Sequence, residues 1–255
     1  WGRFLRYQYA LLDFSEVKEP GIYVVRYGDL KSHPFRIHAN VFTREVWQPT
    51  LEYFLPAQMC HMKVLEKYRL WHGACHLDDA RMAPVNHIHF DGYSQGPETL
   101  TRFRPGEPVP GLDPGGWHDA GDWDMRVESQ ADTIHGLALA WELFHVDYDN
   151  TSIDQKTLVT EIHQPDGKPD VLQQIEHGVL TVVARHEQLG RLYRGIIDPT
   201  LRQYVFLGDG ALMTDNVVFD AKKTPEASAP AVGLPGSPDD RWVFTESNPR
   251  RELQT

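Results

Sequence analysis

Three carboxylates lie close together in one glycine-rich stretch, Gly115-Gly116-Trp117-His118-Asp119-Ala120-Gly121-Asp122-Trp123-Asp124. Glycine adopts positive φ readily and adds no side-chain bulk, so the backbone here can form a tight turn that aims Asp119 and Asp122 into one cleft. Like charges repel, and each carboxylate must be solvated or hydrogen-bonded, so such a cluster is costly in a core. The residues therefore predict a wet site that holds a cation or activates water. An acidic surface turn is the alternative.

A second set of residues has a different ligand chemistry. Cys60 is followed fifteen residues later by Cys75 and His76. Two thiolates and an imidazole suit Zn²⁺, which takes four nitrogen or sulfur ligands in structural sites. Their spacing is not a zinc-finger pattern, so the residues alone leave two other interpretations open. These are two buried free cysteines, or a Cys60–Cys75 disulfide in an exported protein.

The string Asp119-Ala120-Gly121-Asp122 resembles the signature of glycoside hydrolase family 9, the inverting endoglucanases. The resemblance implies that Asp122 is the general base that deprotonates the attacking water, and that Asp119 helps to hold and polarise this water. It also implies hydrolysis of β-1,4-glucan, with cellulose, mixed-linkage glucan and xyloglucan as candidate substrates. In that family the general acid is a Glu near the C-terminal end of the catalytic domain. We find no segment that matches the acid motif, and nothing around Glu246 identifies it as the acid.

The text from Ala74 to Arg81, Ala-Cys-His-Leu-Asp-Asp-Ala-Arg, is similar to the zinc-bearing members of this family. The resemblance implies a structural zinc that braces the acidic turn from behind. Four protein ligands with two thiolates favour this structural role over a catalytic one, which leaves a position open for water. An extra loop, residues 85–112, makes the fourth ligand the least certain, with His61, His72, His87 and His89 as rivals. The implied ligands are Cys60, Cys75, His76 and His118.

Ahead of these motifs, short β-prone runs at residues 8–14, 22–27 and 35–38 are separated by Pro20-Gly21 and Gly28-Asp29, which is a hairpin-like spacing. They resemble the last strands of the immunoglobulin-like module that precedes many family 9 catalytic domains. A whole sandwich of this type needs about 100 residues. We therefore expect residues 1–40 to be the C-terminal part of such a module, in a chain truncated at both ends.

After residue 40 the hydrophobic period becomes helical. It predicts helices around residues 47–62, with a kink at Pro56, around 134–144 and around 171–183, with loop-rich segments at 70–123 and 222–241. Periodicity alone gives a mainly α domain. The family resemblance implies an all-α (α/α)6 barrel, of which residues 41–255 would be the N-terminal part. The missing C-terminal part, on the same or a separate chain, is then an expected partner.

The composition of the chain argues against some classes of binding partner. The 255 residues carry a formal net charge of −11, which argues against binding to nucleic acid or to an anionic membrane surface. No apolar run of 18 residues is present, so nothing in the sequence predicts a membrane span. A secreted or cell-envelope location follows only from the implied polymeric substrate.

Weaker signals remain. Calcium takes hard oxygen ligands, and Asp209 and Asp215 flank a turn that could supply them. Aromatic faces can stack on sugar rings, but core packing is at least as good an interpretation for Trp117, Trp123 and Trp242. The leading function is an endo-β-1,4-glucanase. The alternatives are an exo-acting β-glycosidase on short oligosaccharides, a non-catalytic carbohydrate-binding module that lacks the acid, and a zinc-dependent hydrolase.

Overall fold

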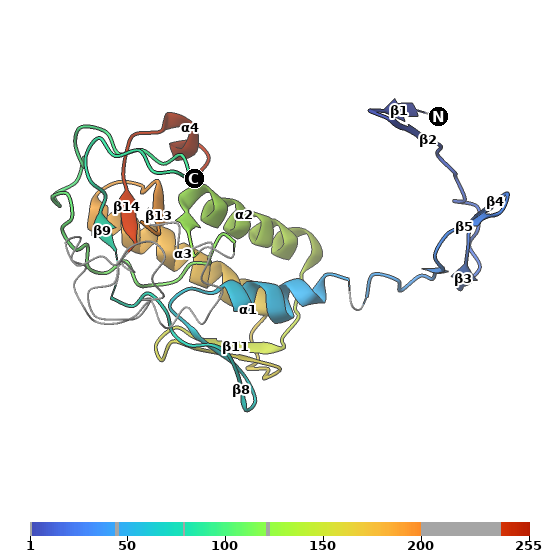
Figure 1. Ribbon diagram of the computed structural model, residues 1–255. Helices are drawn as coiled ribbons and strands as arrows, with labels where there is room; N and C mark the ends of the chain where they lie inside the picture. Colours follow the sequence, from blue (N-terminus) through green and yellow to red (C-terminus); the bar gives the residue numbers. More distant parts are fainter. Residues whose placement is uncertain (1, 44–45, 79, 121–122, 200–240) are drawn as a thin grey trace. The chain divides into compact units, whose positions relative to one another are not determined.

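The computed structural model describes residues 2–43, 46–78, 80–120, 123–199 and 241–255. The chain divides into two compact units, Trp1–Pro49 and Thr50–Thr255, which can be followed by colour in Figure 1. The division falls after Pro49, whereas the sequence placed the change after residue 40. All residues of the acidic turn and of the Cys/His set belong to the second unit.

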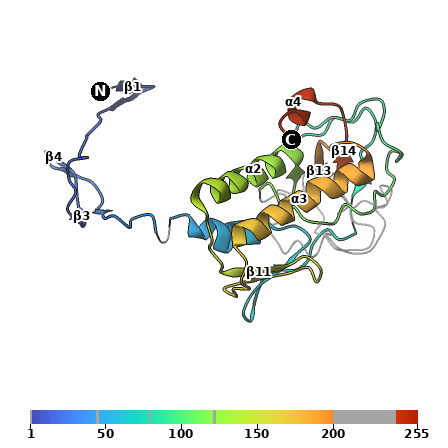
Figure 2. The ribbon, with the colours of Figure 1, turned by 180° about the vertical axis from the view of Figure 1, so that it is seen from behind.

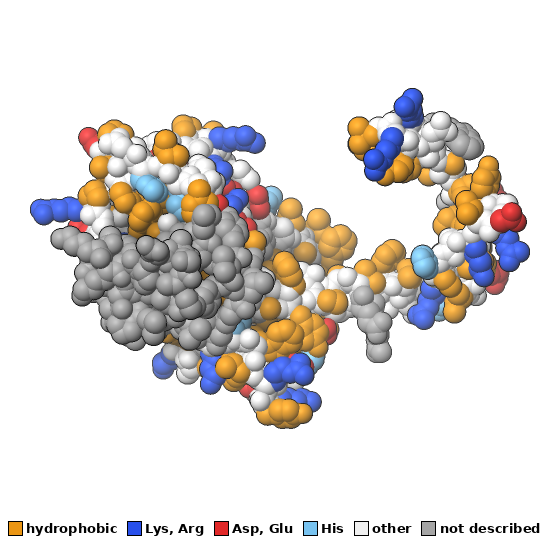
Figure 3. Space-filling model, viewed as in Figure 1, with side chains coloured by type: hydrophobic (Ala, Val, Ile, Leu, Met, Phe, Trp, Pro, Cys, Tyr) orange, Lys and Arg blue, Asp and Glu red, His pale blue; other side chains and the backbone are white. Residues whose placement is uncertain are grey.

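The first unit is built from short antiparallel strand pairs. Its expected strands appear in shorter form, and many of its large apolar side chains, such as Phe4, Leu11 and Ile22, are exposed, as the orange side chains of Figure 3 show. The pairs are β1 (Gly2–Phe4) with β2 (Tyr7–Tyr9), β3 (Gly21–Tyr23) with β6 (Phe35–Ile37), and β4 (Arg26–Tyr27) with β5 (Leu30–Lys31).

Two four-stranded sheets lie in the second unit, each with one parallel pair among antiparallel ones. The first has the order β10 (Met125–Arg126), β13 (Gly195–Ile197), β14 (Trp242–Phe244) and β9 (Arg81–Met82). The second has the order β11 (Thr151–Asp154), β12 (Val159–Ile162), β7 (Lys63–Glu66) and β8 (Arg69–His72). Strand β10 leads directly out of the acidic turn, so the first sheet holds one end of that turn.

Two long helices, α2 (Val127–Phe144) and α3 (Asp170–Leu189), confirm the helices predicted around 134–144 and 171–183. They lie side by side in both views (Figures 1 and 2). Gly178 permits this close approach, because a Cβ there would lie 2.4 Å from the Trp117 ring and 2.6 Å from Ile134. Helix α3 ends at Gly190, whose φ of 71° suits a glycine C-cap. The helix pair thus packs directly against the acidic stretch.

The helix predicted over residues 47–62 is much shorter than expected. A π-helical turn, η1 (Thr50–Phe54), continues into α1 (Leu55–Gln58), and the backbone is extended at Met59. The helix stops because Met59 forms a bridge with Trp117 and the Cys60 N–H donates to the Gly116 carbonyl at 2.8 Å. Tertiary pairing with the acidic stretch therefore overrides the helical pattern, and Met62 lies beyond the helix.

The all-α expectation for residues 41–255 is not met in the part of the chain that the structure describes. Beside α2 and α3 there are two sheets and a short α4 (Pro249–Glu252). The hydrophobic positions at helical spacing could not reveal strands as short as β9 and β10. Among the described residues, no helix is long and apolar enough to cross a membrane.

Candidate functional site

The acidic stretch begins at two glycines in the left-handed region of backbone conformation, where other residues would be strained. Gly115 and Gly116 have φ of 64° and 92°, and a Cβ on Gly115 would lie 2.1 Å from the His177 carbonyl oxygen of α3. A Cβ on Gly116 would lie 2.1 Å from the Met125 side chain. These contacts lie under any real Cβ distance, so the turn needs glycine both for its backbone angles and for space. The sequence expectation of a tight turn is confirmed at this end.

Backbone hydrogen bonds close the turn that follows. The Asp119 N–H donates to the Asp124 carbonyl at 2.7 Å, and the His118 N–H donates to the Gln58 carbonyl at 2.8 Å. In the amide orientation that satisfies its hydrogen bonds, the Gln58 side-chain nitrogen also donates to the carbonyls of His118 at 3.3 Å and Ala120 at 3.2 Å. The end of α1 therefore fixes the first half of the turn.

Asp119 has a cationic partner. The Arg126 guanidinium lies 2.6 Å from the Asp119 carboxylate, whose side chain is 19% exposed. Arg126 also lies over the Tyr93 ring, 5.6 Å from its centroid, and Tyr93 comes from the extra loop. Asp119 is thus held in one orientation while an edge of it stays open to solvent. Asp122, the other predicted carboxylate, lies outside the described residues.

Asp124 differs from Asp119 because its side chain is completely buried. Its carboxylate accepts a hydrogen bond from the Asp198 N–H at 3.3 Å. Asp124 therefore joins the turn to the end of β13. Because it is buried, we expect it to position the turn rather than contact a substrate.

His177 fastens the turn to the middle of α3. The ring is fully buried, with Nε2 2.8 Å from the Gly116 carbonyl and Nδ1 within hydrogen-bond distance of the Gln155 amide. Burial lowers the pKa of His177 to about 3. The ring is therefore neutral at pH 7. In its neutral form Nε2 donates to the carbonyl and Nδ1 accepts from Gln155.

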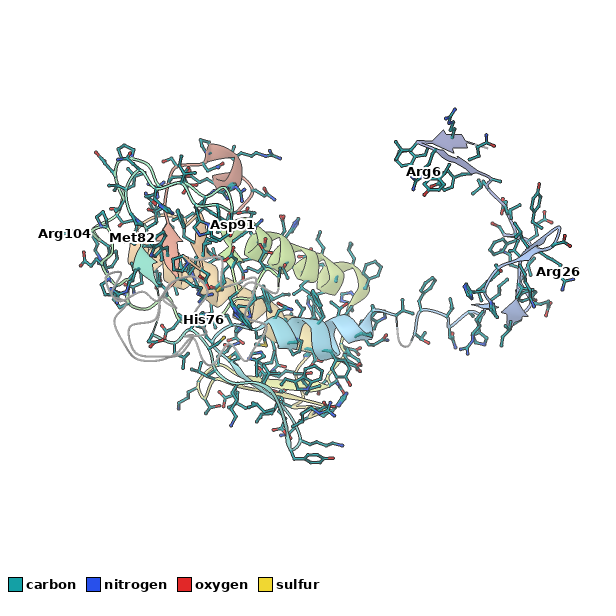
Figure 4. The ribbon with its side chains drawn as sticks, viewed as in Figure 1. Arg6, Arg26, His76, Met82, Asp91 and Arg104 are labelled. Atoms are coloured by element: carbon teal, nitrogen blue, oxygen red, sulfur yellow. The ribbon has the colours of Figure 1, made fainter. Side chains whose placement is uncertain are left out.

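The Cys/His set gathers in one place. The ligand atoms of Cys60, Cys75, His76 and His118 all lie within 4.8 Å of one another, and all four residues are buried. They form the Cys/His cluster, and His76 is labelled in Figure 4 on the segment between β8 and β9. The Sγ atoms of Cys60 and Cys75 are 3.8 Å apart, Cys60 Sγ is 3.6 Å from His76 Nδ1, and Cys75 Sγ is 3.7 Å from His118 Nε2.

These distances fit a zinc ion. A tetrahedron with Zn–S of about 2.3 Å and Zn–N of about 2.0 Å has S–S edges of about 3.8 Å and S–N edges of about 3.5 Å. The three measured separations agree with these edges within about 0.2 Å. The donor set is also that of structural zinc sites, two thiols and two imidazoles. The sulfurs are far beyond the roughly 2.05 Å of a disulfide, and both cysteines are free.

The protonation states suit metal binding as well. Burial and the charge of Arg241 lower the pKa of His76 to about 3. Burial also lowers the pKa of His118, so both imidazoles are neutral ligands at pH 7. Burial raises the pKa of the Cys60 thiol, but the hydrogen bond from Cys75 and the neighbouring cationic charges outweigh this and lower it. Hydrogen bonding to Cys60 and burial raise the pKa of Cys75.

The rival histidines make other contacts, although His61 lies next to the cluster. The Nε2 atom of His61 is 3.5 Å from Cys60 Sγ, but Nδ1 of this ring is 3.0 Å from the Gly115 carbonyl. His87 and His89 pack among aromatic rings beside Phe244, and His72 Nδ1 is 2.9 Å from the Gly73 carbonyl. His118 is the histidine whose ring meets both cysteines and His76, and it directly precedes Asp119 in the chain.

Comparison with known proteins finds two similar curated sequences. Endoglucanase D of Acetivibrio thermocellus is 30% identical to this chain over 138 residues, which cover 52% of this chain and 19% of that protein. A second Endoglucanase D sequence of the same species matches equally, over 18% of its length. About half of this chain is therefore similar to a part of an endoglucanase. The match spans about a fifth of the length of these curated relatives.

Two other comparisons complete this result. No family model matches the chain. The crystal structure of the family 9 endoglucanase J30 shares 24% sequence identity, with a TM-score of 0.48, over 72% of this chain and 31% of that chain.

The three tryptophans considered for sugar stacking pack against protein. Trp117 is buried in the core, and its Nε1 donates to the Gln174 side chain at 2.8 Å. Trp123 lies beside His118 and His76, with ring centroids 5.0 and 6.0 Å away, and Trp242 packs on His87. The core-packing interpretation holds for Trp117. Asp209 and Asp215, the calcium candidates, lie outside the described residues.

Several residues that shape the site gave no signal in the sequence. Arg126, His177 and Gln58 hold the turn, and Arg241 lies next to Cys60. Each is of a common residue type and carries no motif, and Arg241 is far from the turn in the chain. Of these residues, Arg126 alone lies close to Asp119 in the sequence, because β10 directly follows the turn.

Proposed function

We propose that this chain forms the water-activating side of a glycoside hydrolase that cleaves β-1,4 bonds in glucans with inversion. The observation that carries the proposal is the acidic turn, which holds Asp119 beside Arg126, open at its edge and braced from behind by the Cys/His cluster. The relationship to endoglucanases supports the reaction class. Cellulose, mixed-linkage glucan and xyloglucan are the proposed substrates.

In this proposal Asp122 is the general base and Asp119 its partner on the water. An inverting glycosidase needs a second carboxyl, the general acid, about 6.5–9.5 Å from the base, so that water fits between base and sugar. Arg126 holds the Asp119 carboxylate in one orientation, so that a carboxylate oxygen can accept a hydrogen bond from the water. The proton from water then passes to Asp122 as the new C–O bond forms.

The general acid is assigned to the C-terminal part of the barrel, on the same or a separate chain. Glu246 has one property of an acid, because burial raises its pKa. Its carboxylate is, however, 3.0 Å from the Arg194 guanidinium, which favours the ionised form. Glu246 therefore fits a structural ion pair with Arg194 better than it fits proton donation.

The proposed zinc is structural. Cys60, Cys75, His76 and His118 would hold it, and a closed shell of four protein ligands leaves no position for water. When bound, the ion would neutralise the negative charge of the two thiolates and would form a rigid crosslink behind the turn. The protein's own residues do the chemistry.

The finer fold assignments belong to the same proposal. The strand pairs of the first unit are taken as the C-terminal part of an immunoglobulin-like sandwich, residues 1–40, and residues 41–255 as the N-terminal part of an (α/α)6 barrel. The antiparallel pair α2 and α3 would be one helical hairpin of that barrel. A secreted or cell-envelope location follows from a polymeric substrate. Calcium at Asp209 and Asp215 stays a prediction.

The test is release of reducing sugar from mixed-linkage β-glucan by wild-type and Asp122→Asn protein, each together with the C-terminal part of the barrel that supplies the general acid. General-base catalysis contributes about 10²- to 10⁴-fold, so the variant should lose at least about a hundredfold in kcat. Asp113→Asn is the matched control, because Asp113 is exposed in the same segment. Proton NMR of the first products should show the α-anomer. A wild-type protein that binds glucan without cleaving it would favour the carbohydrate-binding alternative.

An exo-acting β-glycosidase is a second candidate, favoured by the extra loop. This loop brings Tyr93 near the acidic turn, where Arg126 lies over its ring. Burial raises the pKa of Tyr93, and the nearby charges include those of Asp119 and Asp124 in the turn. A loop beside the turn would close one end of a cleft. The ratio of viscosity loss to reducing ends distinguishes the candidates, since an endo enzyme lowers viscosity long before many ends appear.

A further inference from the structure

One buried arginine touches both the Cys/His cluster and the acidic turn. Arg241 is 1% exposed. Its Nη1 donates to the Trp123 carbonyl at 2.8 Å, and its Nη2 donates to Cys60 Sγ at 3.6 Å. The guanidinium therefore spans a proposed metal ligand and the residue that directly follows Asp122 in the chain.

The backbone holds Arg241 in place. Its carbonyl accepts from the Arg81 N–H at 2.9 Å, and the next residue begins β14, which pairs in parallel with β9. The side chain thus projects from a fixed strand end. A planar guanidinium also presents its two terminal nitrogens in a rigid fork, which lets one side chain bind two acceptors at once.

Trp123 is a residue that needs such support. Its φ is 62°, in the left-handed region that a bulky residue seldom adopts. Its ring lies against His118 and His76 of the cluster, while its carbonyl is held by Arg241. The strained backbone at Trp123 is therefore held by two contacts. The ring packs on two histidines of the cluster, and the carbonyl accepts from Arg241, which also contacts Cys60.

The turn is consequently anchored at both ends. His118, a proposed zinc ligand, directly precedes Asp119, and Arg241 holds Trp123 at the far end. The Asp119 N–H bond to the Asp124 carbonyl and the Asp198 N–H bond to the Asp124 carboxylate also hold the second half of the turn, but Arg241 is the side chain that ties Trp123 to the Cys60 sulfur. We propose that Arg241 is a positioning residue that couples the Cys/His cluster to the acidic turn by holding the Trp123 carbonyl and the Cys60 sulfur together.

This inference rests on the proposed zinc centre and on the proposed role of the turn. In the zinc-loaded protein Cys60 would be a thiolate with or without Arg241, and there a charged N–H donor to the sulfur lowers its nucleophilicity. Loss of Arg241 should therefore have two separable effects. The turn loosens, and Cys60 becomes more reactive while the four ligands still hold the metal.

The experiment compares the wild-type protein with Arg241→Met and Arg241→Lys, with Arg104→Met as control. Arg104 is exposed on the extra loop and is labelled in Figure 4. Zinc per chain is measured by atomic emission, Cys60 alkylation by iodoacetamide and mass spectrometry, and amide hydrogen exchange in peptides that cover residues 115–126. Hydrolysis of β-glucan gives kcat and KM separately.

We expect Arg241→Met to keep one zinc per chain, to alkylate Cys60 about tenfold faster and to exchange faster in the turn than the wild-type protein. Its kcat should fall about tenfold with KM changed less than twofold, because the turn is misplaced but the sugar-binding surface is intact. Arg241→Lys keeps the charge but has one nitrogen instead of a fork. It should protect Cys60 in part and restore less than half of the lost kcat.

Unchanged exchange and alkylation in a zinc-loaded Arg241→Met would overturn the inference. So would equal changes in Arg104→Met. If Arg241→Met does not fold, Arg241→Lys decides, since wild-type exchange in the turn with this variant also contradicts the coupling. A wild-type protein without zinc refutes the zinc centre and the inference with it. Zinc-loaded wild-type protein that is inactive on glucan refutes the proposed function alone, and exchange and alkylation still decide the role of Arg241.

Discussion

In the Cys/His cluster the ligand atoms face one another, whereas in the acidic turn the described carboxylates face other partners. The four cluster residues are buried and lie within 4.8 Å of one another. Asp119 instead pairs with Arg126, and Asp124 accepts from the Asp198 N–H. The two arrangements meet in the chain where His118, a member of the cluster, directly precedes Asp119 of the turn.

The difference follows from charge. A thiol and a thiolate can share one proton, and imidazoles are neutral when buried, so four soft ligands can approach closely without repulsion. Hydrogen bonding to Cys60 accordingly raises the pKa of Cys75, while that of Cys60 is lowered. Carboxylates that stay ionised near pH 7 repel one another and need a cation or backbone donors. A metal-binding cluster can therefore be preformed, whereas a catalytic carboxylate must be held apart by its own partner.

The largest effect should come from breaking the cluster. We expect Cys75→Ser to lose the metal and to lower the free energy of unfolding by about 3–5 kcal/mol, because binding energy at a structural site is folding energy. At about 2–4 °C per kcal/mol for a chain of this size, the Tm should fall by roughly 10 °C. Calorimetry and metal analysis measure both quantities.

A strong chelator applied to the wild-type protein provides the control for this prediction. It should lower the Tm by a similar amount and leave Cys75→Ser unchanged. A wild-type Tm that does not respond to the chelator would contradict a stabilising metal.

A medium effect should come from acid acting on His177, which joins the turn to α3. Burial lowers the pKa of His177 to about 3 in the folded protein, against about 6.5 in the unfolded chain. Between these values the unfolded state binds a proton and the folded state does not, so stability falls as pH decreases from about 6.5 toward 3. The penalty at pH 5 is about 2 kcal/mol from this residue.

His177→Gln tests this, because a glutamine amide can still donate to Gly116 and accept from Gln155 but does not titrate. The loss of unfolding free energy between pH 7 and pH 5, measured by urea denaturation, should be about 2 kcal/mol smaller than in the wild-type protein. His135→Gln, on the exposed side of α2, should behave as wild type. Equal pH dependence in all three proteins would exclude His177 as the source.

The smallest effect should come from the partner of Asp119. Arg126 is partly exposed, and solvent screens its charge, so Arg126→Met should lower kcat on β-glucan only about tenfold, or about 1.4 kcal/mol. KM should stay within twofold, and Arg126→Lys should recover part of the loss. The zinc content should not change. A drop in zinc content would mean that the turn and the cluster cannot be separated, and the comparison between them would fail.

The sequence allowed the local parts of this site to be predicted. Asp119 and the glycines are contiguous, and Cys75 and His76 are adjacent, so their chemistry is visible in short strings. The helices α2 and α3 were also predicted, because each has more than four turns of regular spacing. Long periodic elements and compact motifs carry their own signal.

What could not be predicted depends on contacts between distant segments. The pattern at Leu51, Leu55 and Met59 is helical, yet the pairing of Met59 with Trp117 ends the helix early. Arg241 reaches Cys60 from a strand end far along the chain. No spacing rule reports such a meeting, because the partners are common residue types whose proximity arises only from the packed fold.

The cluster also has a consequence for the topology of the chain. Its members come from residues 60, 75, 76 and 118, so a bound ion would tie two successive loops shut, as a covalent crosslink would. Closing a loop costs conformational entropy, and this cost grows slowly with loop length. A bound ion would keep both loops closed and so restrict the conformations that these segments can adopt. The long segment between residues 76 and 118, which includes the extra loop, would then be protected from proteases in the loaded protein and cleaved first when the ion is withdrawn.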